Sequence, residues 1–174
     1  MKRLMIVLAA VVILAPASLW AQDPAKAEVF GGFSLLHMSN SGASTTPVGW
    51  QAALAFNANP NMAVVGDFSG HYKDGGKIHS YLGGLRYNHR AEKVTPFVHG
   101  MLGGSNINAG SGLGSVNGFT LGIGGGLDYT ATEKVNIRLV QFDWTPTRFS
   151  TAGVSAWQNN TVRFGFGIVM KVGS

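Results

Sequence analysis

No cysteine occurs among the 174 residues, which excludes disulfides, thiolate metal sites and cysteine nucleophiles. Charged residues are also scarce, at 12% of the chain against about 25% in typical proteins, whereas hydrophobic residues make up an ordinary 45%. A chain with this balance is not expected to be disordered. No G-x-y period runs through it, which excludes collagen. The net charge of +5 is modest and thinly spread, so we expect no nucleic-acid partner.

Helical patterning is missing after Gln22, because no stretch repeats apolar residues at helical spacing over several turns. Glycine is abundant instead, with 25 residues, about twice the usual share of 7%. Each interior glycine disfavours a helix by roughly 1 kcal/mol. Period-two alternation of apolar and polar residues replaces the helical pattern and predicts β-strands.

The first 21 residues have the composition of a secretory signal. Lys2–Arg3 provides a positive start, and a run of apolar residues follows that ends near Ala17. The run is short for a membrane-spanning helix, which needs about 20 residues. We therefore expect export from the cytoplasm and cleavage after Ala17 or Ala21, with residues 1–21 as signal peptide and 22–174 as a single mature domain.

The mature chain alternates in eight segments. In the last of them, every second residue from Val162 to Val172 is apolar, and Arg163 and two glycines lie between them. The seventh segment slips in phase, and a β-bulge at Leu139–Val140 would restore the alternation. The expected strands lie near residues 27–38, 49–58, 62–73, 77–90, 94–106, 117–131, 135–149 and 159–173.

The connections between these segments alternate in length. Those at 39–48, 106–117 and 150–158 are long and rich in small polar residues, and the others are short. The short Asp74–Gly76 turn is the exception, because it belongs to the long-loop end. Short turns at one end and longer loops at the other are typical of an up-and-down outer-membrane barrel.

Alternation by itself fits a soluble barrel with an apolar interior as well as a membrane barrel with an apolar exterior. The less apolar face favours the membrane, because it is rich in glycine and lacks the dense Lys and Glu of a water-exposed surface. Segments of roughly 10–14 residues also suffice to cross a bilayer on a tilt. Aromatic residues near the segment ends suggest two interfacial girdles, formed by Trp50, Tyr72, Phe119 and Trp144 at the long-loop end and Phe56, Tyr87 and Tyr129 at the other.

Three short pieces and the closing strand carry a resemblance to a known family. The pieces are Glu28–Ser34, Val94–Gly100 and Gly124–Asp128. With these, the mature chain resembles the small outer-membrane β-barrel family that includes the transmembrane domain of OmpA. The resemblance implies an eight-stranded, antiparallel, up-and-down transmembrane β-barrel (all-β) in the outer membrane of a Gram-negative-type bacterium, with both termini in the periplasm.

The resemblance implies no single activity, because members of this family include structural anchors, adhesins, invasins and a few lipid enzymes. We expect a structural, anchoring or surface-loop role without a cofactor, metal or catalytic residue. The expected partners are outer-membrane lipid, an extracellular partner at the long loops and, during insertion, the outer-membrane assembly machinery. The pattern from Arg163 to Met170 resembles the C-terminal signal that this machinery reads.

Polar residues on the expected inward faces predict a structural network in the lumen. A charge in a narrow barrel must find a partner or stay hydrated, so we expect several of them to pair, with Arg138 and Asp143 as one pair to test. Filling of the lumen is favoured over a pore that gates, because eight strands leave little room. The predicted network comprises Asp67, Arg86, Asp128, Arg138, Gln141, Asp143 and Arg163, and Glu28 and Lys171 also face inward.

Three alternatives remain open at this point. A soluble, lipocalin-like ligand binder would need the apolar face inside. A lipid enzyme is suggested by His37–Asn40, which resembles the His-x-Ser-Asn piece of outer-membrane lipid A deacylases and would make His37 the base and Ser39 the nucleophile. That piece comes early here, and no acidic residue follows nearby to orient the His. A narrow, porin-like diffusion pore is the third alternative.

Overall fold

The computed structural model describes residues 25–40, 42–108, 110, 114–151 and 154–173. The predicted signal peptide at 1–21 lies outside these ranges. Within them, no helix is long and apolar enough to cross a membrane.

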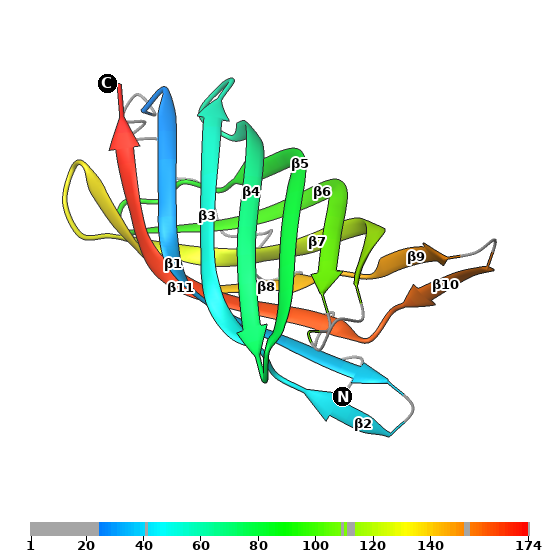
Figure 1. The fold of residues 1–174 in the computed structure, drawn as a ribbon. Coiled ribbons are helices and arrows are strands. Elements are labelled where there is room, and N and C mark those ends of the chain that lie inside the picture. The colour runs from blue at the N-terminus through cyan, green and yellow to red at the C-terminus, as the bar shows by residue number, and fades with distance from the viewer. Residues whose placement is uncertain (1–24, 41, 109, 111–113, 152–153, 174) are drawn as a thin grey trace, which may run out of the picture.

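Eight long antiparallel strands form the body of the molecule (Figure 1). They contain between 10 and 16 residues each, enough to cross a bilayer on a tilt. Their bounds are β1 Ala27–Asn40, β3 Val48–Asn57, β4 Met62–Lys73, β5 Gly76–Asn88, β6 Val94–Asn108, β7 Ser115–Thr130, β8 Val135–Trp144 and β11 Thr161–Val172.

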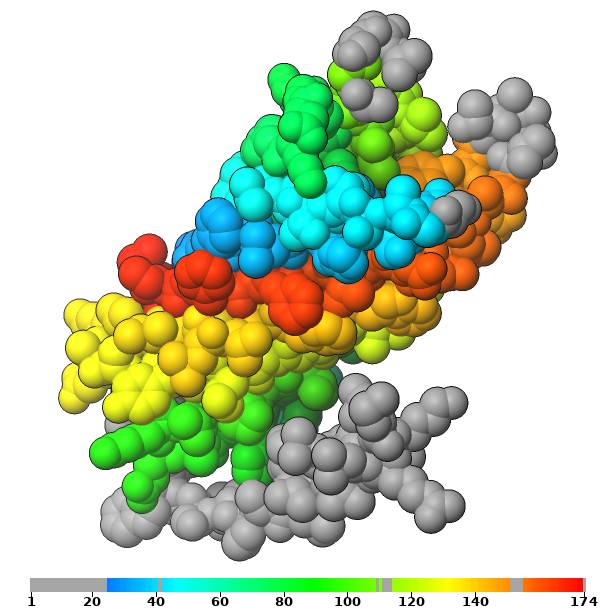
Figure 2. Space-filling view, turned by 90° about the horizontal axis from the view of Figure 1, so that it is seen from below, coloured from blue at the N-terminus to red at the C-terminus, as the bar shows by residue number. Residues whose placement is uncertain are grey.

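Each of these strands pairs with the next along the chain, and β1 pairs with β11 to close the sheet into a barrel. The closing ladder runs from Ala27 opposite Val172 to Met38 opposite Thr161. Figure 2 shows the seam, with β11 lying between β1 and β8. The predicted eight-stranded, antiparallel, up-and-down barrel is therefore confirmed.

The phase slip in β8 is a β-bulge, as predicted. Arg138 lies opposite Asp128 on β7, while Val140 already lies opposite Leu127, so Leu139 is the extra residue. Both Leu139 and Val140 face outward. The bulge lets the inward positions on the two sides of it point into the same lumen.

Three short strands extend the barrel at the end opposite the C-terminus (Figure 1). β2 (Ala43–Thr45) folds back on β1, and β9 (Thr147–Thr151) pairs with β7 and with β10 (Val154–Gln158). The long connections expected at 39–48 and 150–158 therefore contain paired strands, which the sequence analysis did not predict. The predicted strand 135–149 is likewise divided, since β8 ends at Trp144 and β9 begins after Pro146.

The turn between β4 and β5 is short for a local reason. Asp74 and Gly75 have φ values of +50° and +81°. Two successive positive φ angles are those of a type I′ hairpin turn, for which Asp-Gly is a preferred pair. This turn needs no longer loop, although it lies at the long-loop end.

Candidate functional site

Alternation along the eight strands places the polar residues inside the barrel. All seven residues of the predicted lumen network are at least 97% buried. Six of them are joined in one chain of hydrogen bonds and ion pairs, and Arg86 belongs to a second group.

Arg163 on β11 is the centre of the first group. Its guanidinium reaches across the lumen to Asp67 on β4, with Nη1 2.7 Å from Oδ1, and donates to Asp143 on β8 from both Nε and Nη2, at 2.9 and 2.7 Å. Nη1 also lies 3.1 Å from the hydroxyl of Ser69. One side chain thus ties three strands of the barrel together by charge-assisted bonds.

Arg138 lies closer than Arg163 to the short-turn end of the barrel, and two kinds of contact hold it. It makes a bidentate pair with Asp128, at 2.8 and 2.9 Å, and its guanidinium carbon lies 4.3 and 4.4 Å from the ring centroids of Phe30 and Phe97. The two rings therefore flank the cation at distances at which cation–π attraction operates. The lumen at this level is filled by one ion pair and two aromatic rings.

The expected pairing of Arg138 with Asp143 is corrected by the structure. Gln141 lies between them, accepting from Arg138 Nη1 at 2.7 Å and donating to Asp143 Oδ2 at 2.8 Å. The ionic partner of Arg138 is Asp128, because these two residues are directly opposite across the β7–β8 ladder. The bulge separates Arg138 from Asp143 and leaves room for the amide that links them.

Besides Ser69, two members of this group were not predicted from the sequence. His99 Nε2 lies 2.7 Å from Asp143 Oδ1, and Gln51 Nε2 donates to Asp67 Oδ2 at 2.6 Å. Both side chains face inward, whereas the residues just before them in the chain, Val98 and Trp50, face outward. The alternation of apolar and polar residues was therefore the signal that could have found them. His and Gln side chains carry no formal charge at pH 7, so a pattern of paired charges does not reveal them.

The second group lies nearer the short turns and is built on Glu28. This carboxylate pairs with Arg86 from β5 and with Arg90, whose Nη2 lies 2.8 Å from Oε1. Asn57 completes the group, bonding to both Glu28 and Arg90. Arg86 was predicted as part of one network, and the structure places it in this separate group at the other end.

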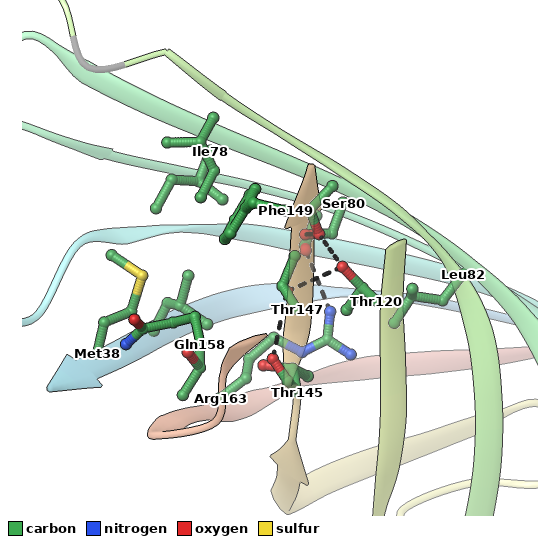
Figure 3. Close-up of a pocket in the computed structure, with 15 residues that line it drawn as sticks. Met38, Ile78, Ser80, Leu82, Thr120, Thr145, Thr147, Phe149, Gln158 and Arg163 are labelled. Carbon is green, nitrogen blue, oxygen red and sulfur yellow. Dashed lines mark hydrogen bonds between the residues drawn. The ribbon is translucent and has the colours of Figure 1, made fainter. Parts of the chain in front are cut away.

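The lumen beside the Arg163 group has little free volume. The cavity at its outer end measures about 20 Å³, which accommodates about one water molecule. Hydroxyls line it from several strands, and Figure 3 shows Ser80, Thr120 and Thr147 pointing into it above Arg163. Thr145 Oγ1 is buried there without a partner among the described residues, which makes this spot suitable for one ordered water.

The outer wall has the opposite character. Leu102, Val98 and Phe56, which are 61, 60 and 56% exposed, belong to an almost continuous apolar surface. The seven aromatic residues of the two expected girdles all point outward. A lipocalin-like binder requires an apolar cavity inside, whereas here most large apolar side chains are outside, and inward ones such as Phe30 and Phe97 pack against a buried arginine. The arrangement is that of a barrel in a lipid solvent.

The possible deacylase piece at the end of β1 lacks catalytic geometry. His37 Nδ1 is 2.9 Å from Thr46 Oγ1, and the Ser39 backbone is held by Asn160 and by the side chain of Gln158. No hydrogen bond joins His37 to Ser39 among the described residues. Within the same part of the chain, no three His, Asp or Glu side chains gather as a metal site.

Comparisons with known proteins agree with this architecture. No family model and no curated protein sequence matches the chain. Among solved structures, Neisserial surface protein A is similar with a TM-score of 0.61 at 15% identity, covering 84% of this chain and 97% of that protein. The N-terminal β-barrel domain of Pseudomonas aeruginosa OprF gives 0.59 at 14% identity, covering 86% and 98%.

A third similar structure is Ail, the attachment invasion locus protein of Yersinia pestis. It gives a TM-score of 0.55 at 16% identity and covers 84% of this chain and 98% of that protein. At these identities the likeness shows the fold alone. That fold is the small eight-stranded barrel of outer-membrane proteins, while the narrower resemblance to OmpA stays a prediction.

Proposed function

We propose that this protein is an integral outer-membrane barrel that anchors and displays its extended hairpins, and that it is not an enzyme. One observation carries the proposal: the apolar side chains cover the outside of the barrel, and the buried charges are paired inside it. A charge in the lumen is tolerated because it is partnered, and an apolar wall is tolerated because lipid solvates it.

The filled lumen supports a structural role over transport. Arg163 and Arg138 cross the interior at two levels, and Phe30 and Phe97 pack against Arg138. Opening a path would require breaking buried ion pairs, which is costly when their charges are left unpartnered. We therefore assign the network the role of holding the barrel closed and rigid.

A surface-contact role is supported by the hairpin β9–β10. Trp157 is 46% exposed on it, opposite Arg148, and the hairpin projects beyond the barrel. One structure of Ail is a complex with the heparin analogue sucrose octasulfate. We propose that the projecting end of this chain meets an extracellular partner. Replacing residues 148–157 by a short Gly-Ser turn should then abolish binding in a cell-attachment assay.

Membrane residence is tested by fractionation combined with a heat-shift gel. The full precursor is expressed, the outer membrane is separated from the periplasm, and unboiled and boiled samples are compared. We expect recovery in the outer membrane and altered mobility on boiling. A periplasmic, soluble product without a mobility shift would overturn the proposal.

Two arginine substitutions make the same test quantitative. Leu102 lies midway along β6, and Val48 begins β3 at its outer end; both side chains face outward. In a membrane, Leu102→Arg should reduce the free energy of unfolding by about 2–4 kcal/mol and the matched Val48→Arg by about 0–1 kcal/mol. Equal and negligible effects at the two depths would indicate that water, not lipid, surrounds the wall.

A further inference from the structure

The barrel contains two classes of strand glycine. At inward positions such as Gly49 and Gly84, an added Cβ would lie 1.8 and 2.0 Å from a backbone oxygen, so only glycine allows the strands to pack. At Gly100 on the outer wall, an added Cβ would meet nothing within 4 Å, and at Gly66 and Gly83 the nearest atom is 3.9 Å away. None of these three needs a positive φ angle.

Gly66, Gly83 and Gly100 lie on neighbouring strands. Gly66 on β4 is directly opposite Gly83 on β5, and Gly100 on β6 is opposite Leu85, two residues further along β5. A strand glycine weakens its strand unless another group must approach the backbone closely. Because nothing in the chain itself approaches Gly100, the open space is suited to a group from outside the chain.

Gly100 forms the floor of a wide, open groove on this wall. The groove has a volume of about 430 Å³ and is walled by apolar side chains. Leu85 and Ile123 flank Gly100 on the two neighbouring strands, and Tyr87 and Val98 lie one row lower. The complete lining is Met62, Leu85, Tyr87, Val98, His99, Gly100, Ile123 and Gly124, with His99 directing its side chain into the lumen.

We propose that this groove is a binding site for one glycerophospholipid of the membrane, with an acyl chain lying over Gly100 and the phosphate at the turn between β5 and β6. The proposal rests on the proposed function, since it requires the wall to face lipid. Inside a bilayer neither water nor a void can occupy an apolar groove, so a hydrocarbon chain is the occupant that matches its lining.

The turn that joins β5 to β6 supplies the complementary charge. Lys93 is exposed and makes no ion pair among the described residues, and Glu92 precedes it. Arg90 in the same turn is occupied by Glu28, and the exposed Glu133 and Lys134 belong to the neighbouring turn. A phosphate beside Lys93 and an amine beside Glu92 would suit a zwitterionic headgroup such as phosphoethanolamine.

The spacing fits one leaflet. Lys93 and Gly100 are seven positions apart, roughly 23 Å along a strand. A strand tilt near 40° reduces this to roughly 18 Å along the membrane normal. One leaflet of hydrocarbon is about 15 Å thick. A headgroup at Lys93 would therefore place the end of its acyl chain near Gly100.

Photo-crosslinking in nanodiscs tests the site. The probe is phosphatidylethanolamine with a photoreactive group near the end of one acyl chain, and crosslinks are mapped by mass spectrometry. We expect labelling to concentrate on the groove residues and to fall about tenfold in Gly100→Leu, equivalent to about 1.4 kcal/mol. Gly31→Leu is the matched control, because Gly31 is equally open on the outer wall but lies outside the groove. Its labelling pattern should equal that of the wild type.

A second arm examines the headgroup. A diacylglycerol probe with the same chains should label the wild type less than the phospholipid does, and Lys93→Gln should remove this difference. Leu85→Ala, which removes one wall of the groove, should lower labelling without filling the site. Equal labelling of Gly100→Leu and wild type, or a crosslinked second copy of the chain at the groove, would overturn the proposal. Heat-shift gels run on every variant separate this failure from failure of the barrel to insert.

Discussion

Arg163 shows how one residue can decide whether a polar core is tolerable. Its guanidinium satisfies Asp67 and Asp143 together, from strands that are not neighbours of each other. Gln51 and Ser69 supply the remaining bonds nearby. Because two carboxylates depend on one cation, the cost of losing Arg163 exceeds the loss of its own contacts.

Arg163→Met should therefore reduce the free energy of unfolding by about 3–5 kcal/mol, because two buried carboxylates lose their cation. Denaturant titration of the folded fraction on unboiled gels measures this. The control is the triple change Arg163→Met, Asp67→Asn and Asp143→Asn, which removes all three charges and should recover part of the loss. A single variant as stable as wild type would contradict the assigned role.

Arg138 provides a second prediction at this scale. A double-mutant cycle of Arg138→Met with Asp128→Asn should give a coupling energy of about 1–3 kcal/mol, since the two are in direct bidentate contact. The cycle of Arg138→Met with Asp143→Asn should give a smaller value, because only Gln141 connects them. A reversed order of the two couplings would restore the pairing expected from the sequence.

At the scale of the element, the bulge in β8 keeps the lumen network in register. Arg138 points inward before it and Gln141 inward after it, although the two are three residues apart. Regular alternation would turn one of them toward lipid, at a cost of about 2–4 kcal/mol for an arginine near the midplane. The bulge is thus required by the order of side chains in this strand.

Deletions in β8 test this directly. Removing Leu139 leaves Arg138 in, Val140 out and Gln141 in, so the barrel should still fold. Removing Ile137 instead gives a regular alternation in which Asn136 stays inside, Arg138 faces the lipid and Leu139 faces the lumen, so folding into bilayers should fail. The folded fraction on heat-shift gels is the readout. Equal folded fractions for the two deletion variants would show that β8 can shift its pairing register with its neighbours, and would contradict the role assigned to the bulge.

At the scale of the whole molecule, closure and filling act together. The β1–β11 ladder removes the free edges of the sheet, and the ion pairs and aromatic rings fill the space that closure creates. The cavity at the outer end of the lumen measures about 20 Å³. With the lumen filled in this way, we expect no continuous path for a hydrated ion.

Planar-bilayer recordings of the folded protein should therefore show no discrete conductance steps. A wide porin inserted under the same conditions is the positive control. Protein pre-incubated with denaturant gives the background from unfolded material. Reproducible single-channel steps from the folded barrel would mean that the Arg163 and Arg138 groups rearrange, and would favour the pore alternative.

The sequence by itself determined the number of barrel strands, their inward and outward faces and the bulge at Leu139–Val140. These features follow from period-two patterning, which is a local property of the backbone. It also indicated which polar residues face inward, Arg163 and Asp128 among them. The hairpins at β2 and β9–β10 were missed, because glycine- and serine-rich segments carry little alternation.

Only the tertiary structure decided which inward residues meet. Asp67 and Arg163 are 96 positions apart, and their contact depends on the width and stagger of the closed barrel, which no local pattern encodes. The division into an Arg163 group and a Glu28 group, the place of Gln141 between Arg138 and Asp143, and the groove over Gly100 arise in the same way. Each depends on how strands distant in sequence are aligned, because register in space is fixed by closure of the whole sheet.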